Sequence, residues 1–193
     1  LSSTAADGGI DAFEMLYAPL DVDRAYRLHR ANCGPASFAA LVGCDICEVM
    51  DFFPGFRAKP VTNIPRMRAA LRGSGIRFRR ESRQFPSDGL VLIQVEGPWS
   101  VASRAAFDAP RHRHWVSVRL GYVYEVNLES WVPRQVWEED YLPSLVARHS
   151  GATGCSVSAV FVLESEATGR VSESFGDNYA LRSASGRPCR KRR

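Results

Sequence analysis

The chain has 193 residues, of which 45% are hydrophobic, and this size and composition suit one globular domain with a substantial core. No stretch approaches the roughly 20 apolar residues of a membrane-spanning helix, so we expect no membrane partner. The net charge of +4 is concentrated at one end, because the last seven residues hold five basic groups and no acid, which leaves the rest of the chain near −1 (+4 less 5).

Signals for helices come first along the chain. Gly43 is typical of a residue that ends a helix, and Pro54 ends a second helical pattern. Pro65 suits the first turn of a third helix, which closes at Gly73. The predicted helices run over residues 33–42, 45–53 and about 62–73.

Signals for strands follow. Two β-rich runs flank Leu120 and Gly121 and therefore predict a hairpin, and a continuous apolar run before them predicts a buried strand. After the hairpin, Trp137 and Tyr141 recur at helical spacing, although Pro143 should kink or shorten any helix there. The predicted strands are Ile76–Arg79, Leu90–Val95, His112–Arg119, Tyr122–Asn127 and Ser156–Leu163.

This order of elements predicts an α+β fold, in which N-terminal helices pack on an antiparallel β-sheet. We expect the helix that begins at Cys33 to lie across the sheet that carries His114. There is no internal repeat and no sign of a second domain. We therefore divide the chain into an N-terminal extension (1–25), one domain (26–163) and a polar tail with a basic C-terminus (164–193). Before residue 26 the pattern does not decide between strand and helical turn.

The segment Asn32-Cys33-Gly34-Pro35 places one cysteine at the start of a predicted helix. A thiol in this place lies over unpaired backbone N–H groups and the positive end of the helix dipole, both of which favour the thiolate. Cys33 is therefore a candidate nucleophile. A lone cysteine at a helix start is also a common packing residue, and only its Gly-Pro context with a downstream His and Asn favours the catalytic interpretation.

A candidate base lies in the predicted hairpin. If the turn is centred between Leu120 and Gly121, His114 faces Asn127 as a direct cross-strand neighbour, about 5 Å away at Cβ. The three residues then form a triad in which Cys33 attacks, His114 carries the proton and Asn127 fixes the imidazole. A loop one residue longer or shorter would place a neighbour of Asn127 opposite His114 instead.

Two motifs, Asn32-Cys33-Gly34-Pro35-Ala36 and His114-Trp115-Val116, resemble those of the papain-like cysteine peptidase superfamily. The nearest likeness is to its compact bacterial and phage branch, the bacteriocin-processing type of peptidase. Small phage-encoded proteins are similar also in segments like Gln94–Trp99 and Tyr124–Asn127. The likeness covers roughly Arg30 to Val162. It implies a papain-like domain over residues 26–163 and thiol-dependent acyl transfer on an amide or isopeptide bond.

One position departs from the family pattern. Papain-like enzymes usually carry a glutamine a few residues before the cysteine, which donates to the oxyanion, whereas residues 27–31 here read Arg-Leu-His-Arg-Ala. The backbone N–H of Cys33 is one candidate donor, and the side chains of Asn32 and Gln94 are alternatives for the second. Because the loss of one such donor typically costs about 10²–10³ in rate, a weak or inactive enzyme remains an open alternative.

Other residues offer competing interpretations. His112 lies two residues before His114 on the same strand face and is a rival for the role of base. Cys44 and Cys47 form a Cys-x-x-Cys, but no second ligand pair follows at zinc-finger spacing, so we expect buried cysteines there. The five cysteines are odd in number and irregularly spaced, which argues against a disulfide framework and for a reducing, intracellular compartment. No metal and no cofactor is predicted.

The basic C-terminus is the remaining functional candidate. Such a tail binds nucleic acid, acts as a localisation signal or is a solvated end. Its candidate nucleic-acid-binding residues are Arg187, Arg190, Lys191, Arg192 and Arg193.

We therefore expect a cysteine peptidase or isopeptidase with a peptide or protein substrate. The first alternative is a catalytically inactive papain-like structural or binding protein of a virion or another large assembly, with a tail that contacts nucleic acid. A ubiquitin-type deconjugating enzyme is a third possibility, because that branch also pairs an early cysteine with a late histidine followed by an aromatic residue.

Overall fold

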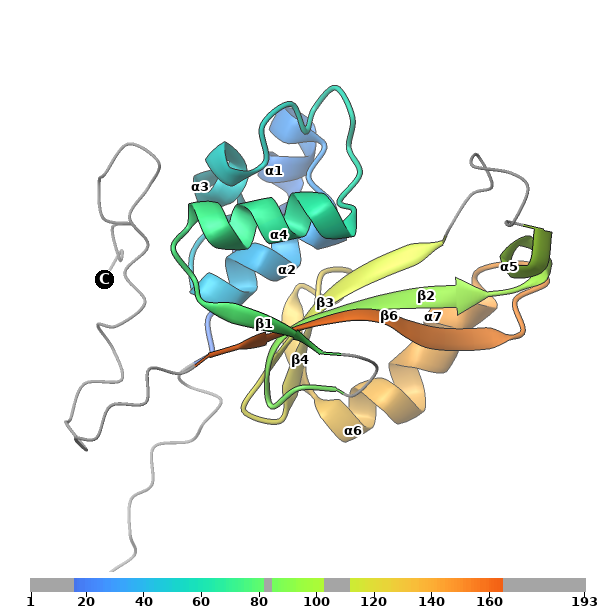
Figure 1. Ribbon diagram of the computed structural model, residues 1–193. Helices are drawn as coiled ribbons and strands as arrows, with labels where there is room; N and C mark the ends of the chain where they lie inside the picture. The colour runs from blue at the N-terminus through green and yellow to red at the C-terminus, as the bar shows by residue number, and fades with distance from the viewer. Residues whose placement is uncertain (1–15, 82–84, 103–111, 165–193) are drawn as a thin grey trace, which may run out of the picture.

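The first part of the fold is helical, as the sequence predicts (Figure 1). The structure is a computed structural model, and it describes residues 16–81, 85–102 and 112–164. Asn32 caps the second helix through a side-chain hydrogen bond, and Gly43 ends it in the left-handed conformation with φ of 74°. The helices of this part are α1 (Val22–His29), α2 (Cys33–Val42), α3 (Ile46–Val49), the 3₁₀-helix η2 (Met50–Phe52) and α4 (Ile64–Gly73).

A six-stranded antiparallel sheet follows, with strand order β1-β6-β2-β3-β4-β5. The predicted buried run forms the long central strand of this sheet, because a strand covered on both faces needs apolar side chains on both. The strands are β1 (Phe78–Glu81), β2 (Asp88–Glu96), β3 (Arg113–Arg119), β4 (Tyr122–Glu125), β5 (Ser130–Pro133) and β6 (Gly154–Leu163).

Residues 134–147 form one helical segment after β5, and a short helix, α5 (Pro98–Ala102), follows β2. The segment consists of α6 (Arg134–Val136), the π-helical turn η3 (Trp137–Tyr141) and α7 (Leu142–Ala147). Pro143 lies at the beginning of α7, directly after the π-helical turn. Proline has no backbone N–H to donate to the preceding turn. Because the preceding turn is widened to a π-helix, that hydrogen bond is not required, and the helix continues past Pro143 instead of ending there.

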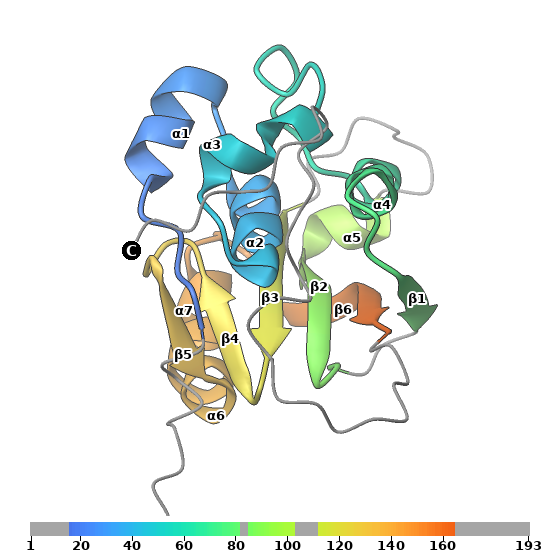
Figure 2. The same ribbon diagram turned by 90° about the vertical axis from the view of Figure 1, so that its left-hand side faces the viewer.

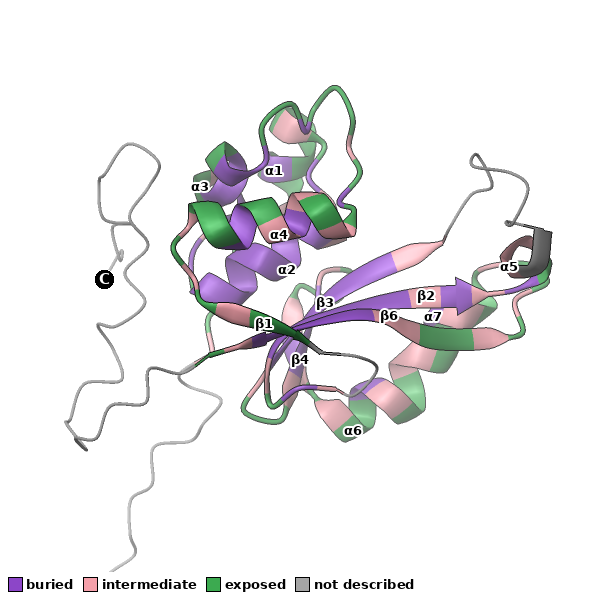
Figure 3. Cartoon of the chain, in the orientation of Figure 1, coloured by how far each residue is buried: buried purple, intermediate pink, exposed green. Residues whose placement is uncertain are grey.

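Helices cover both faces of the sheet. The N-terminal helices lie on one face and the segment from α6 to α7 lies on the other, as the two views show (Figures 1 and 2). Nine of the ten residues of α2 are buried, and this helix packs mainly on β3. Figure 3 shows the resulting core, with α2 and the central strands buried and the outer sides of α4 and α7 partly exposed. The α+β class predicted from the sequence is thus confirmed, with a second helical layer that the sequence did not predict.

Residues 16–25, predicted to be part of an N-terminal extension, belong to the fold. The indole N–H of Trp131 donates to the carbonyl oxygen of Tyr17 at 2.9 Å. The carboxylate of Asp21 accepts the backbone N–H groups of Ile46 and Cys47 at 2.7 and 3.0 Å and so caps α3. Helix α1 runs across the predicted boundary after residue 25, and α1, α5 and β5 are elements that the sequence pattern did not reveal.

Within the described residues, no single helix has the length and apolar character to cross a membrane. The pair formed by Cys33–Val42 and Ile46–Phe52 passes that test together, on length and composition alone, with a bend of 97° between its parts.

Candidate active site

The site is built at the first turn of α2. The side chain of Asn32 accepts a hydrogen bond from the backbone N–H of Gly34 at 3.2 Å and donates one to the carbonyl of Pro60 at 2.8 Å. Asn32 therefore caps the helix and ties its start to the segment before α4. Cys33, the first residue of α2, is only partly exposed, and its thiol stands at the positive end of a ten-residue helix.

Gly34 is required by close packing. A Cβ atom at this position would overlap the side chain of Thr62. The carbonyl of Thr62 in turn accepts the indole N–H of Trp115 at 2.8 Å, which links the same segment to β3. The glycine beside the cysteine thus lets the chain before α4 lie directly against the start of α2.

Helix α2 packs on β3 near the point where the pairing of β3 with β4 ends. The ladder between these strands runs from Arg119–Tyr122 to Ser117–Tyr124 and goes no further. The hydroxyl of Ser37 donates to the carbonyl of Trp115, beyond the end of this ladder, at 2.8 Å, and the hydroxyl of Ser117 donates to the carbonyl of Ser37. Helix α2 thereby supplies a partner for a backbone carbonyl of β3 that β4 does not reach, and its first residue, Cys33, lies beside His114.

The thiol of Cys33 and the imidazole of His114 lie beside each other, close enough to interact. Burial opposes ionisation of the thiol, but the charge of His114, its hydrogen bond and a backbone hydrogen bond from Trp115 outweigh that effect, and the pKa of Cys33 is lowered. Burial also disfavours the imidazolium, yet Cys33 and Glu125 together raise the pKa of His114 to about 10. The two shifts favour a thiolate–imidazolium pair around neutral pH.

Glu125 holds the other side of the imidazole. Nε2 of His114 lies 2.9 Å from both carboxylate oxygens of Glu125, which is fully buried. Because Nε2 faces Glu125, the ring nitrogen left for Cys33 is Nδ1. Burial alone would raise the pKa of the Glu125 carboxyl, but its hydrogen bond with His114 and the charge of that residue lower it.

The carboxylate of Glu125 is further held by two neighbours. The backbone N–H and the side-chain amide of Asn127 donate to Oε1 at 3.1 and 2.8 Å, and the indole N–H of Trp137 donates to Oε2 at 3.2 Å. Trp137 is fully buried in the π-helical turn η3. A buried carboxylate with this many donors is fixed in position as well as in charge.

Asn127 does not have the position predicted for it. The hairpin register is as predicted near the turn, where Arg119 pairs with Tyr122. However, β4 ends at Glu125, and a turn follows in which the N–H of Leu128 bonds to the carbonyl of Glu125 at 3.0 Å. The acceptor beside His114 is therefore Glu125, and Asn127 acts on that carboxylate. The signal in the sequence was a lone acidic residue in an apolar strand, on the same strand face as Asn127.

The two predicted side-chain donors for an oxyanion are engaged elsewhere. Asn32 uses its oxygen on Gly34 and its nitrogen on Pro60. Gln94 pairs with Arg113 across β2 and β3, and its amide donates to Glu96 at 3.3 Å. The backbone N–H of Cys33 is the candidate that remains, since the first N–H groups of a helix have no partner within the helix.

The alternative candidates for the base and the nucleophile, His112 and the other described cysteines, have different neighbours from those of His114 and Cys33. The ring of His112 packs on that of His149 with centroids 4.1 Å apart and edge-on to Trp99 at 4.9 Å. Burial and the nearby Asp21 raise the pKa of Cys47 to about 12, and burial raises the pKa of Cys155 as well. Cys33, in contrast to Cys47 and Cys155, has a lowered pKa and lies beside a histidine.

Among residues 16–81, 85–102 and 112–164, no group of three or more His, Cys, Asp or Glu side chains is arranged to hold a metal ion. The five basic residues singled out in the C-terminal tail, from Arg187 to Arg193, lie outside the described residues.

Comparison with known proteins gives no match to this chain, whether by family model, among curated proteins or among solved structures.

Proposed function

We propose that the protein is a papain-like cysteine hydrolase that cleaves a peptide, isopeptide or related amide bond. Cys33 is the nucleophile, His114 the general base and acid, and Glu125 the residue that orients His114. The observation that carries the proposal is the arrangement of Cys33, His114 and Glu125, in which the buried imidazole has the thiol on one side and the carboxylate, hydrogen-bonded to Nε2, on the other. A nucleophile, a base and an orienting group in this order are what acyl transfer requires.

In the first half of the reaction, the Cys33 thiolate attacks the carbonyl carbon of the scissile bond and forms an S–C bond. The electron pair of the C=O bond moves to oxygen, and we assign the backbone N–H of Cys33 as a donor to that oxygen. When the tetrahedral intermediate collapses, the C–N bond breaks and Nδ1 of His114 gives its proton to the departing amine. The product of this half is a thioester on Cys33 and a free amine.

In the second half, water attacks the thioester while Nδ1 of His114 takes its proton. Collapse of this intermediate breaks the S–C bond, releases a carboxylic acid and restores the thiolate with the imidazolium. Glu125 keeps its hydrogen bond to Nε2 throughout and so holds the ring in one orientation as Nδ1 loses and regains its proton.

The first experiment tests whether Cys33 is alkylated faster than the other cysteines. The full-length protein is treated with iodoacetamide at pH 6, and the alkylation of each cysteine is followed by mass spectrometry. We expect Cys33 to react at least 30-fold faster than Cys47 and Cys155, because an ordinary thiol with a pKa near 8.5 is less than about 1% ionised at pH 6. Equal rates for exposed Cys155 and Cys33 would contradict the proposal.

Turnover is tested separately from reactivity. A peptide library is incubated with the protein and with the variant Cys33→Ala, and new amino termini are identified. Cleavage products that depend on Cys33 support a hydrolase. A fast-reacting Cys33 without any cleavage product would favour the inactive, binding form of the fold instead. The side-chain engagement of Asn32 and Gln94 is the observation that makes this second outcome worth measuring.

A further inference from the structure

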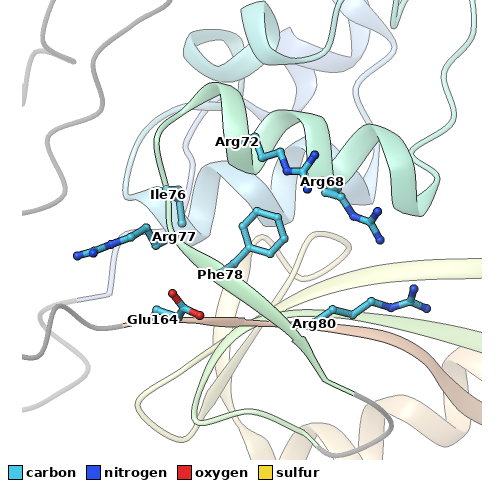
Figure 4. Close-up of a pocket in the computed structure, with 7 residues that line it drawn as sticks. All are labelled: Arg68, Arg72, Ile76, Arg77, Phe78, Arg80 and Glu164. Carbon is cyan, nitrogen blue, oxygen red and sulfur yellow. The ribbon is translucent and has the colours of Figure 1, made fainter.

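A groove with a volume of about 410 Å³ lies between α4 and β1, outside the Cys33 site (Figure 4). Four arginines, one glutamate and two apolar side chains line it. Arg68 and Arg72 come from α4, and Arg80 comes from β1. Figure 4 shows the side chains of Arg68 and Arg80 extending to the same side of the groove, with Phe78 between the helix and the strand.

Three of the four arginines that line this groove have no acidic partner among the described residues. In the described part of the chain, Arg68, Arg72 and Arg80 take part in no ion pair, and Glu164 is the one carboxylate that lines the groove. Arg68 and Arg72 stand four residues apart on one helix face, a spacing at which like charges repel. An anionic ligand would relieve that repulsion, and guanidinium groups bind carboxylates in a bidentate geometry.

The strand beside the groove is an edge of the sheet. In the described sheet, β1 pairs with β6 and has no strand on its other side. An edge strand offers backbone N–H and C=O groups to an extended polypeptide, which adds to the sheet as a further strand. Alternate side chains of such a strand point to one face, and acidic side chains there would face the arginines of α4.

We propose that this groove binds an acidic, extended segment of a polypeptide. The apolar lining favours a peptide over a nucleic acid, because Phe78 is held edge-on to Phe161 with centroids 5.2 Å apart and its ring is only partly exposed. Binding of single-stranded nucleic acid relies on open aromatic faces on which bases stack. The proposal does not require a reactive Cys33, so it stands or fails separately from the proposed hydrolase.

The experiment measures binding of fluorescently labelled peptides to the full-length protein by anisotropy at low salt. The probe is a peptide of about twelve residues that alternates glutamate and threonine, and its neutral partner carries glutamine in place of each glutamate. We expect the acidic peptide to bind at least 10-fold more tightly than the neutral one. Arg68→Glu with Arg80→Glu should weaken its binding at least 10-fold, and bound peptide should slow amide hydrogen exchange in β1.

The matched control is Arg24→Glu with Arg27→Glu, which makes the same change in net charge on α1, a helix that lies away from α4 and β1 in Figure 2. This control should change affinity less than threefold. Equal weakening by both double variants, or equal binding of the acidic and neutral peptides, would overturn the proposal. So would a labelled single-stranded DNA that binds more tightly than the acidic peptide and loses that binding in the groove variant. If the charge reversals unfold the protein, Arg68→Gln with Arg80→Gln gives the same test.

Discussion

His112 and His114 are two residues apart on the same strand face, yet their different neighbours give the two imidazoles different chemical properties. The imidazole of His114 is buried between Cys33 and the carboxylate of Glu125. His112 has its ring against those of His149 and Trp99 instead. Strand alternation places both histidines on the same face, yet of the two His114 is the one that lies between the first residue of α2 and the carboxylate of Glu125. The difference teaches that the neighbours supplied by α2 and β4, rather than the histidine itself, make the site.

The largest expected effect separates these two histidines directly. With His114→Ala, the Cys33 thiol loses its imidazolium partner, and its pKa should return to about 8.5 or higher. The ionised fraction at pH 6 then falls below about 1%, so alkylation of Cys33 should slow by about 100-fold. His112→Ala should leave that rate within about twofold. Equal slowing by both substitutions would remove the distinction between the two sites.

Glu125→Gln should cost the most stability of the substitutions considered. It removes the charge from a fully buried partner of His114, and breaking one side of a buried pair costs about 3–5 kcal/mol. Urea unfolding at pH 7 measures this loss. The control, Glu129→Gln, changes an exposed carboxylate in the following turn and should stay within about 0.5 kcal/mol. A change of less than 1 kcal/mol for Glu125→Gln would show that the carboxylate does not hold His114.

The pH dependence of stability gives a second test of the interaction between His114 and Glu125. The raised pKa of His114 contributes stability that is fully present below its unfolded value of about 6.5 and is lost as pH rises through about 10. With Glu125→Gln, one of the causes that raise this pKa is removed, so the loss should begin at lower pH. Urea midpoints between pH 6 and pH 10 should therefore decline earlier in Glu125→Gln than in the parent protein. Parallel curves would contradict a charge role for Glu125.

Trp137→Phe should have an intermediate effect. The substitution keeps an aromatic ring but removes the N–H that donates to Glu125 at 3.2 Å. A hydrogen bond to a charged group contributes about 1.5–3 kcal/mol, so unfolding free energy should fall by about 2 kcal/mol, with some of it due to the smaller ring. Trp131→Phe removes a bond to the neutral carbonyl of Tyr17 and should cost less. The reverse order would contradict the importance of the carboxylate network.

Asn127→Ala should have the smallest effect on reactivity. In the structure Asn127 donates to Glu125, and Glu125 in turn contacts the imidazole of His114, so Asn127 acts on the imidazole only through that carboxylate. Its side-chain amide is lost in the variant while its backbone N–H stays, so alkylation of Cys33 at pH 6 should slow less than threefold. A loss as large as that of His114→Ala would restore the predicted triad with Asn127 as the direct partner of His114.

Local signals explain what the sequence predicted well. Helix α2 runs over the predicted range because its first and last residues are set by neighbours in the chain, a capping Asn32 and a glycine at position 43. The register of the hairpin next to Leu120 and Gly121 was also predicted, since a tight two-residue turn fixes it. The pairing of Cys33 with His114 remained a hypothesis, because residues about eighty positions apart meet only through the packing of α2 on β3.

The third residue of the site could not be predicted by the same arithmetic. Extending the ladder to Asn127 assumes that β3 and β4 stay paired, but the pairing ends at Ser117 and Tyr124, and the hydroxyl of Ser37 in α2 donates to the next β3 carbonyl, that of Trp115. Likewise, Trp131 and Trp137 look alike in the sequence, and only tertiary packing sends one indole to Tyr17 and the other to Glu125. Long-range contacts of this kind leave no periodic pattern.

The most direct test of the account is the ionisation of Cys33 itself. Thiolate absorbance near 240 nm is recorded against pH for the parent protein and for Cys33→Ala, and the difference isolates this one thiol. The account predicts that the Cys33 thiolate forms at a lower pH than that of an ordinary thiol with a pKa near 8.5, and that His114→Ala moves its formation to about pH 8.5 or above. A parent protein whose Cys33 ionises only near pH 8.5, unaffected by His114→Ala, would contradict the ion pair and with it the proposed hydrolase.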